Sequence, residues 1–222
     1  MIKIIKYSFP INSSVQMMNM NILNDKIMLM MIMLMMLVMM MLTFNLINKM
    51  IFKLMFDNQK LEFLWTIFPM IMIIVISYYS VMTLYLNNEM KSNSINIKIT
   101  GNQWFWNYNY MNFNMKFNSY MIYNNMFNFN IMETDNKMII PLNTQIMIII
   151  SSLDVIHSWS IPSMNIKIDA IPGQINNSVI QTNKVLIMFG QCSEICGINH
   201  SFMPIMVESI LMKNFIQWIK NN

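Results

Sequence analysis

Several residue types are scarce or missing in this chain of 222 residues. Arginine is absent, alanine occurs only at Ala170, and there are four glycines, two cysteines and two histidines. Charged residues make up only 11% of the chain and hydrophobic residues 55%, which is too little charge for a purely soluble protein. The 14 basic residues are all lysines and are scattered. The sequence therefore has no basic run of the kind that binds nucleic acid.

Methionine is the opposite case, with 31 residues. Depletion of alanine, glycine and arginine is what AT-rich codons would give. A methionine excess fits a genetic code in which AUA is read as Met, as in many animal mitochondria. We therefore hypothesise that the chain is encoded in that organelle.

The first 91 residues predict a transmembrane hairpin. Residues 27–47 form a nearly continuous apolar run without charge, and about 20 such residues cross a bilayer as a helix. Residues 67–86 form the second span, with Pro69 in its first turns and with Trp65 and Tyr85 as interfacial flanks. The N-terminal tail (residues 1–26) and the connector between the spans (residues 48–60) both carry a net charge of +2. The positive-inside rule therefore does not orient the hairpin.

Residues 92–222 show a different periodicity, which predicts a second, all-β domain. Apolar and polar residues alternate over 95–99 and 127–130, and short apolar runs occupy 146–150 and 185–189. Several short strands separated by turn residues are typical of a sandwich or barrel. Residues 215–219 read as a terminal helix.

Residues 190–204 contain the chemistry. This segment, GQCSEICGINHSFMP, holds the only two cysteines and one of the two histidines. The other histidine, His157, precedes Cys192 by 35 residues. Thiolate, imidazole and thioether ligands together suit copper. The spacing alone also allows a disulfide, one stripe of a helix, or two inert buried thiols.

This segment resembles the copper loop of cytochrome c oxidase subunit II, and residues 151–159 resemble the first-histidine segment of that family. The resemblance extends to residues 62–66, 101–106 and 169–173. It implies a two-helix transmembrane hairpin followed by an all-β, cupredoxin-like Greek-key barrel.

The resemblance also implies a dinuclear copper centre. The two cysteines would bridge both coppers, one histidine and the methionine would complete one copper, and the other histidine and a backbone carbonyl would complete the second. The implied ligands are, in that order, Cys192, Cys196, His157, Met203, His200 and the carbonyl of Glu194.

Three further roles follow from the resemblance. The Glu194 carboxylate would bind a magnesium ion shared with the catalytic subunit. Trp104 would be the point where electrons enter from cytochrome c, and Glu62 would lie at the mouth of a proton path. Each residue also has an alternative without a specific function. Glu194 could be a solvated acid in a loop, Trp104 a packing aromatic, and Glu62 a charge at the membrane interface.

The implied protein lies in the mitochondrial inner membrane, with its C-terminal domain in the intermembrane space. It would take electrons from cytochrome c and pass them to haem in catalytic subunit I, in contact with other oxidase subunits and the lipid bilayer. The sequence departs from the family where acids for docking cytochrome c are common. Here Asn109, Asn112, Asn114 and Lys116 occupy that region.

The rival interpretation is a membrane-anchored copper chaperone of the Sco type, which also carries Cys-x3-Cys. That family has a single span and a histidine far downstream, whereas no histidine follows His200 here. A membrane hairpin with a disulfide-stapled, metal-free β domain is a third reading. The number of coppers per chain separates the three: two, one or none.

Overall fold

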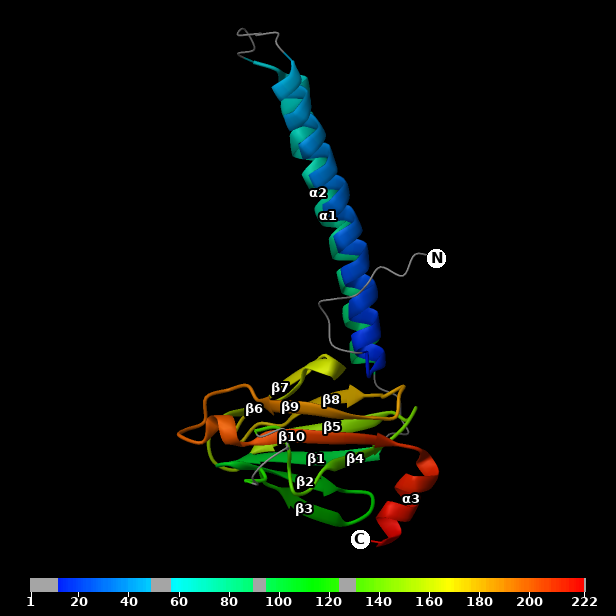
Figure 1. Ribbon diagram of the computed structural model, residues 1–222, viewed down its shortest axis with the longest axis vertical. Helices are drawn as coiled ribbons and strands as arrows, with labels where there is room; N and C mark the ends of the chain where they lie inside the picture. The colour runs from blue at the N-terminus through cyan, green and yellow to red at the C-terminus, as the bar shows by residue number, and fades with distance from the viewer. Residues whose placement is uncertain (1–11, 49–56, 90–94, 124–130, 222) are drawn as a thin grey trace. The chain divides into compact units, whose positions relative to one another are not determined.

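The computed structural model describes residues 12–48, 57–89, 95–123 and 131–221. By their internal contacts these fall into two units, one of residues 19–86 and one that joins the residues up to 18 to residues 87–222. The first unit is helical and the second is mostly β (Figure 1).

Two long helices run side by side in the helical unit (Figure 1). Helix α1 spans Val15–Ile47 and α2 spans Gln59–Asn88. Both are long and apolar enough to cross a membrane. The ends at Ile47 and near Leu86 agree with the predicted spans, but both helices begin earlier. Pro69 is consequently the eleventh residue of α2 and lies inside the helix rather than near its start.

Local hydrogen bonds explain where these helices begin. Ser14 caps α1, because its Oγ accepts a hydrogen bond from the backbone N–H of Met17 at 3.0 Å. Asn58 caps α2 in the same way, through its Oδ1 and the N–H of Leu61 at 3.2 Å.

The β unit consists of two five-stranded sheets, ordered β3-β2-β1-β5-β8 and β4-β10-β9-β6-β7. Most neighbours are antiparallel, but β1 pairs with β5 and β10 with β4 in parallel. The strands are β1 (Ile95–Asn102), β2 (Phe105–Tyr110), β3 (Met115–Ser119), β4 (Met138–Pro141), β5 (Ile146–Ser152), β6 (His157–Ile161), β7 (Ile166–Ala170), β8 (Asn176–Ile180), β9 (Leu186–Cys192) and β10 (Pro204–Ile210). Short 3-10 turns η1 (Pro162–Met164) and η2 (His200–Phe202) precede β7 and β10, and helix α3 (Met212–Asn221) ends the chain.

The core lies between the two sheets. Strand β5 alternates buried and half-buried residues along its length, so Ile146, Ile148 and Ile150 point inward. The largest fully buried side chains include Trp106, from one sheet, and Trp159, from the other. The predicted segments 95–99 and 146–150 lie in β1 and β5, the third lies in β9 except for Val185, which precedes it, and the terminal helix is present. The alternating segment 127–130 lies outside the described residues.

The sequence did not predict that the segment before α1 packs on the β unit. Ser13 and Ser14 are fully buried, and their hydroxyls donate to the backbone carbonyls of Ser163 and Met164 at 2.6 and 2.8 Å. The Gln16 amide adds a hydrogen bond to the carbonyl of Val179 at 2.6 Å. Ser13, Ser14 and Gln16 therefore belong to the β unit, which the polar composition of this segment did not indicate.

Candidate metal centre

Adjacent strands bring His157 and Cys192 together. His157 is the first residue of β6 and is fully buried. Cys192 is the last residue of β9, and the register of β6 on β9 pairs it with Trp159. Because side chains two apart on a strand share a face, the sheet sets His157 beside Cys192. The His157 Nδ1 lies 3.9 Å from the Cys192 Sγ.

The loop between β9 and β10 supplies the remaining donors. Cys196 is buried, and its Sγ lies 3.5 Å from both the His200 Nδ1 and the Met203 Sδ. The Cys192 Sγ lies 3.3 Å from the backbone carbonyl oxygen of Glu194. Both cysteines are free thiols. The ligand atoms of His157, Cys192 and Cys196 all lie within 4.8 Å of one another, which is a group able to hold a metal ion.

The two thiols differ in acidity. Burial raises the pKa of Cys192, but the hydrogen bonds with the His157 imidazole and with the Ser158 and Glu194 backbone, together with the charge of His157, outweigh it, so the pKa falls below its usual value. For Cys196, burial and the negative charge of Cys192 both act upward and raise the pKa to about 12. Metal binding to this pair must therefore displace a proton from Cys196 in particular.

Asp154 supports the ligand His157 from behind. Its Oδ1 lies 2.8 Å from the His157 Nε2, and its carboxylate also accepts the backbone N–H groups of Gln103 and Val155 at 2.6 Å each. Burial opposes the charged form, yet these hydrogen bonds, led by that of His157, hold the pKa of Asp154 below its usual value. A carboxylate on the far nitrogen orients a ligand histidine. Sequence reasoning missed this role, although an acid three residues before a candidate ligand is a usable signal.

Two glycines make room for the site. A Cβ on Gly101 would lie 2.8 Å from the Cδ2 of His157, so only glycine leaves space for that imidazole. Gly197, with φ of +132°, follows Cys196 and lies against Trp104. A Cβ there would be 3.1 Å from the Cζ2 of the indole. The Trp104 ring is thus packed directly on the loop that carries the cysteines.

Two other aromatic contacts tie the loops together. The Trp106 Nε1 donates to the backbone carbonyl of Met203 at 3.2 Å, and its ring meets that of His157 edge-on at 5.9 Å. The Gln103 side chain donates to the carbonyl of Cys196 at 2.7 Å. Neither Trp106 nor Gln103 was singled out from the sequence as a site residue. Nothing in the sequence around Trp106 or Gln103 indicates a role at the site, because their partners lie in the distant loop between β9 and β10.

Seven of the eight predicted site residues lie together in the β unit, and the eighth, Glu62, belongs to the helical unit. His157, Cys192, Cys196, His200 and Met203 converge with the Glu194 carbonyl, while the Glu194 side chain is exposed. Trp104 lies against this group. Glu62 is in the first turn of α2, in the other unit, and is exposed.

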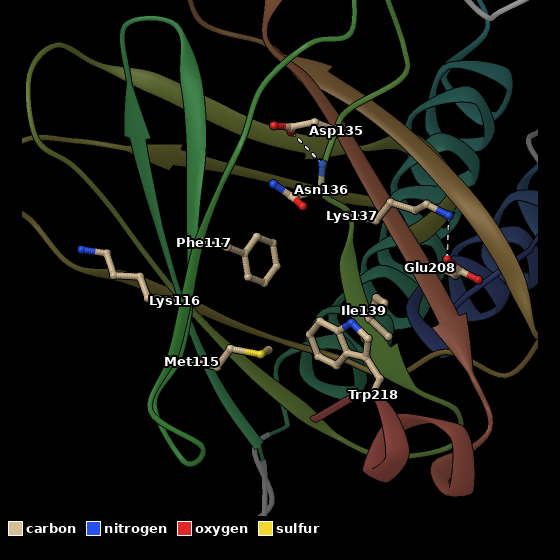
Figure 2. Close-up of a pocket in the computed structure, with 9 residues that line it drawn as sticks. All are labelled: Met115, Lys116, Phe117, Asp135, Asn136, Lys137, Ile139, Glu208 and Trp218. Atoms are coloured by element: carbon tan, nitrogen blue, oxygen red, sulfur yellow. Dashed lines mark hydrogen bonds and ion pairs between the residues drawn. The ribbon is translucent and has the colours of Figure 1, made fainter. Parts of the chain in front are cut away.

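A cavity of about 290 Å³ lies elsewhere, between β3, the segment before β4, β10 and α3 (Figure 2). Phe117 and Trp218 both line it, with their ring centroids 6.3 Å apart and their planes nearly perpendicular. The Lys137–Glu208 ion pair at 2.9 Å lies at one side (Figure 2). None of the predicted site residues lines it.

Comparison with known proteins gives one consistent result. The family "Cytochrome C oxidase subunit II, transmembrane domain" matches residues 3–83, and its periplasmic-domain counterpart matches residues 95–210. Cytochrome c oxidase subunit 2 of Ctenocephalides felis is 48% identical over 181 residues, 80% of each chain. That of Sitophilus granarius is 48% identical over 178 residues, 78% of each chain.

Solved structures agree with this result. The periplasmic domain of subunit II from Bradyrhizobium japonicum is 35% identical, with a TM-score of 0.57, and the match covers 60% of this chain and 96% of that one. A mixed disulfide intermediate between a thioredoxin-like protein and subunit II of cytochrome c oxidase is 34% identical, with a TM-score of 0.54, over 60% of this chain and 93% of that one.

Fold and comparisons together define a membrane-anchored protein with a cupredoxin-like domain. Within that class, the chain belongs to the cytochrome c oxidase subunit II family, and its relatives are part of an oxidoreductase complex. The predicted family and fold class are confirmed, and the Sco-type alternative is not favoured.

Proposed function

We propose that this chain is the subunit of respiratory cytochrome c oxidase that accepts single electrons from cytochrome c and passes them to haem in catalytic subunit I. The observation that carries the proposal is a connected cluster of two thiols, two imidazoles and a thioether, in which both cysteines, His157 and Met203 are buried. Trp104 is packed against Gly197, in the loop that holds Cys196 and His200. Electron transfer of this kind makes and breaks no covalent bond, so it needs neither a nucleophile nor a general base.

The donor set fits a dinuclear copper centre. The thiolates of Cys192 and Cys196, the imidazoles of His157 and His200, the Met203 thioether and the Glu194 carbonyl would hold the two coppers. When bound, two coppers that share two thiolates spread one electron over both metals, so the ligands move little on reduction. Both cysteines and Met203 are buried, which keeps water from these three sulfur ligands.

The Glu194 backbone and side chain would serve two metals. Its carbonyl points to Cys192, whereas its exposed carboxylate is free to meet a magnesium ion at the contact with the catalytic subunit. Magnesium keeps several waters and uses one or two protein carboxylates, so the catalytic subunit would supply the rest. Glu62, exposed at the start of α2, would lie at the mouth of a proton path.

The two candidate transmembrane helices and the family support an anchored position. We place the anchor in the mitochondrial inner membrane, with the β unit in the intermembrane space and the connector between the helices in the matrix. Contacts with other oxidase subunits would complete the assembly.

Copper analysis of the purified chain tests the function. Two coppers per chain are expected. One copper per chain would indicate a chaperone-like site, and none would indicate a β domain without metal. Trp104→Phe tests the electron path: it should slow electron transfer from cytochrome c while leaving the binding of cytochrome c nearly unchanged. A matching loss of binding would make Trp104 a docking residue instead.

A further inference from the structure

The two cysteines of the proposed centre are held by different means. Cys192 is the last residue of β9, a strand that lies between β10 and β6 in its sheet. Cys196 lies in the loop between β9 and β10, outside regular secondary structure, and is only 4% exposed. The sheet therefore fixes the backbone of Cys192, whereas the backbone of Cys196 depends on other contacts.

Side-chain packing within this chain gives the loop around Cys196 little support. Ile195 and Ile198 are 84% and 92% exposed, and Gly197, which follows Cys196 with φ of +132°, has no side chain to pack. Segments with few packed side chains open locally at a low free energy. Hydrogen bonds to the loop backbone therefore decide how firmly Cys196 is held.

Gln103 makes such a hydrogen bond at Cys196 itself. It lies in the turn between β1 and β2, and its side-chain Nε2 donates to the Cys196 carbonyl oxygen at 2.7 Å. A Cβ on Gly197 would lie 3.2 Å from the same nitrogen, so the amide packs closely on the loop. This hydrogen bond is partly buried, where such a bond is stronger than in water. The Gln103 amide thus fixes the peptide unit that joins Cys196 to Gly197.

The backbone of Gln103 is tied to the other side of the site. Its N–H donates to the Asp154 Oδ2 at 2.6 Å, and the Asp154 Oδ1 lies 2.8 Å from the Nε2 of His157. A continuous set of hydrogen bonds therefore runs from His157 through Asp154 and Gln103 to Cys196. Trp104 follows Gln103 directly, so the same turn carries the proposed point of electron entry.

We propose that Gln103 is a positioning residue, which sets the place of the Cys196 sulfur relative to His157. The amide does for Cys196 what the strand pairing does for Cys192. The consequence for copper rests on the proposed function, but the hydrogen bond acts in the metal-free chain as well. Loss of a group that orients a metal ligand lowers metal affinity about 10- to 100-fold.

Alkylation of the metal-free full chain, followed by mass spectrometry, measures the two cysteines separately. Gln103→Met keeps the length of the side chain and removes the donor. We expect Cys196 to react roughly fivefold faster in this variant than in the native chain, the effect of one lost hydrogen bond on local opening. Cys192, held by β9, should react at its native rate.

Gln145→Met is the matched control for the same change of side chain. Gln145 comes just before β5, at the end of that strand away from His157, and its amide donates to the carbonyl of Glu89 at 3.3 Å. This variant should alter the alkylation of neither cysteine.

Copper titration gives a second readout. Gln103→Met should still bind two coppers, with an affinity about tenfold lower than that of the native chain. The hyperfine splitting of its electron resonance signal should change as well, because this splitting depends on the orientation of the bridging cysteine. Gln145→Met should match the native chain in both measurements.

Two results would overturn the proposal. Equal acceleration of both cysteines in Gln103→Met would give Gln103 a role in general stability alone. An unchanged alkylation rate of Cys196 would show that the amide does not hold it, and weaker binding of cytochrome c in the same variant would then make Gln103 a docking residue. Failure of the proposed function would appear differently, as a native chain that binds fewer than two coppers, while the alkylation result would still stand.

Discussion

The hairpin and the loop between β9 and β10 use their residues in opposite ways. Residues 27–47 are mostly Met, Leu, Ile and Val, and most of their side chains are exposed in the isolated chain. In residues 190–204, by contrast, a single atom such as the Cys196 Sγ lies 3.5 Å from two other candidate ligand atoms, the His200 Nδ1 and the Met203 Sδ. The hairpin depends on composition, and the loop depends on the identity of each residue.

This difference follows from the surroundings of each region. A lipid-facing side chain needs only to be apolar, and methionine, a good helix former with a flexible thioether, meets that need anywhere. A metal ligand must supply one kind of atom at one place. Substitutions should therefore be tolerated in the first region and severe in the second.

The largest effect is expected for Cys196→Ser. Loss of one shared thiolate should abolish the dinuclear centre, with loss of its near-infrared band and its split electron resonance signal. Met36→Leu in the hairpin is the matched control and should change neither. Spectra of the purified complexes check both, and a surviving delocalised signal in the serine variant would disprove the ligand assignment.

Gly101→Ala should have the next largest effect. The added methyl would lie 2.8 Å from the His157 ring, so the imidazole must move, and we expect copper affinity to fall roughly 10- to 100-fold. Gly173→Ala is the control, since Gly173 has φ of +76° but nothing within 4 Å of the added Cβ. That variant should lose stability but bind copper normally, as thermal melts and copper titration would show. Equal copper affinity of the two variants would mean that His157 adapts.

The sequence predicted the two regions unequally well. Unbroken apolar runs and alternating strands predicted the hairpin and the β unit, because period and length are local properties. The roles of Trp106 and Gln103 were not predicted, because their contacts with Met203 and Cys196 join segments far apart in the chain. The early start of α1 was missed for the same reason, since Ser14 is buried against Met164. Asp154 was missed although its contact with His157, three residues later, is local.

Met203→Leu should have a smaller effect than either change above. Met203 is buried, with its Sδ 3.5 Å from the Cys196 Sγ, and as a weak axial ligand it should tune the metal rather than hold it. Leucine has a similar volume. We expect both coppers to stay, with a shifted reduction potential and slower transfer to haem. Met206→Leu, also buried but on β10, is the control. Loss of copper from the Met203 variant alone would give Met203 a structural role.

The smallest expected effect concerns how cytochrome c is attracted. Residues 89–222 contain seven acids and eight lysines, and Asn109, Asn112, Asn114 and Lys116 occupy the region where the resemblance to the family implies acids. The acid beside the ligands, Asp154, stays ionised at neutral pH because its pKa is lowered. Long-range attraction is therefore weaker here. The second-order rate with cytochrome c should fall less steeply with salt than in an acid-rich relative with its own partner.

A single substitution sharpens this last comparison. The Oδ1 of Asn112 accepts the backbone N–H of Asn96 at 2.8 Å, and an aspartate can accept the same hydrogen bond. Asn112→Asp thus adds one negative charge without removing a contact, and it should steepen the salt dependence while changing the rate at low salt by less than about threefold. Lys116→Gln, on the exposed edge of β3, should act in the same direction by removing a positive charge. If neither variant changes the slope, the face around β2 and β3 takes no part in docking, and the charges that guide cytochrome c lie beside Asp154 or on other subunits.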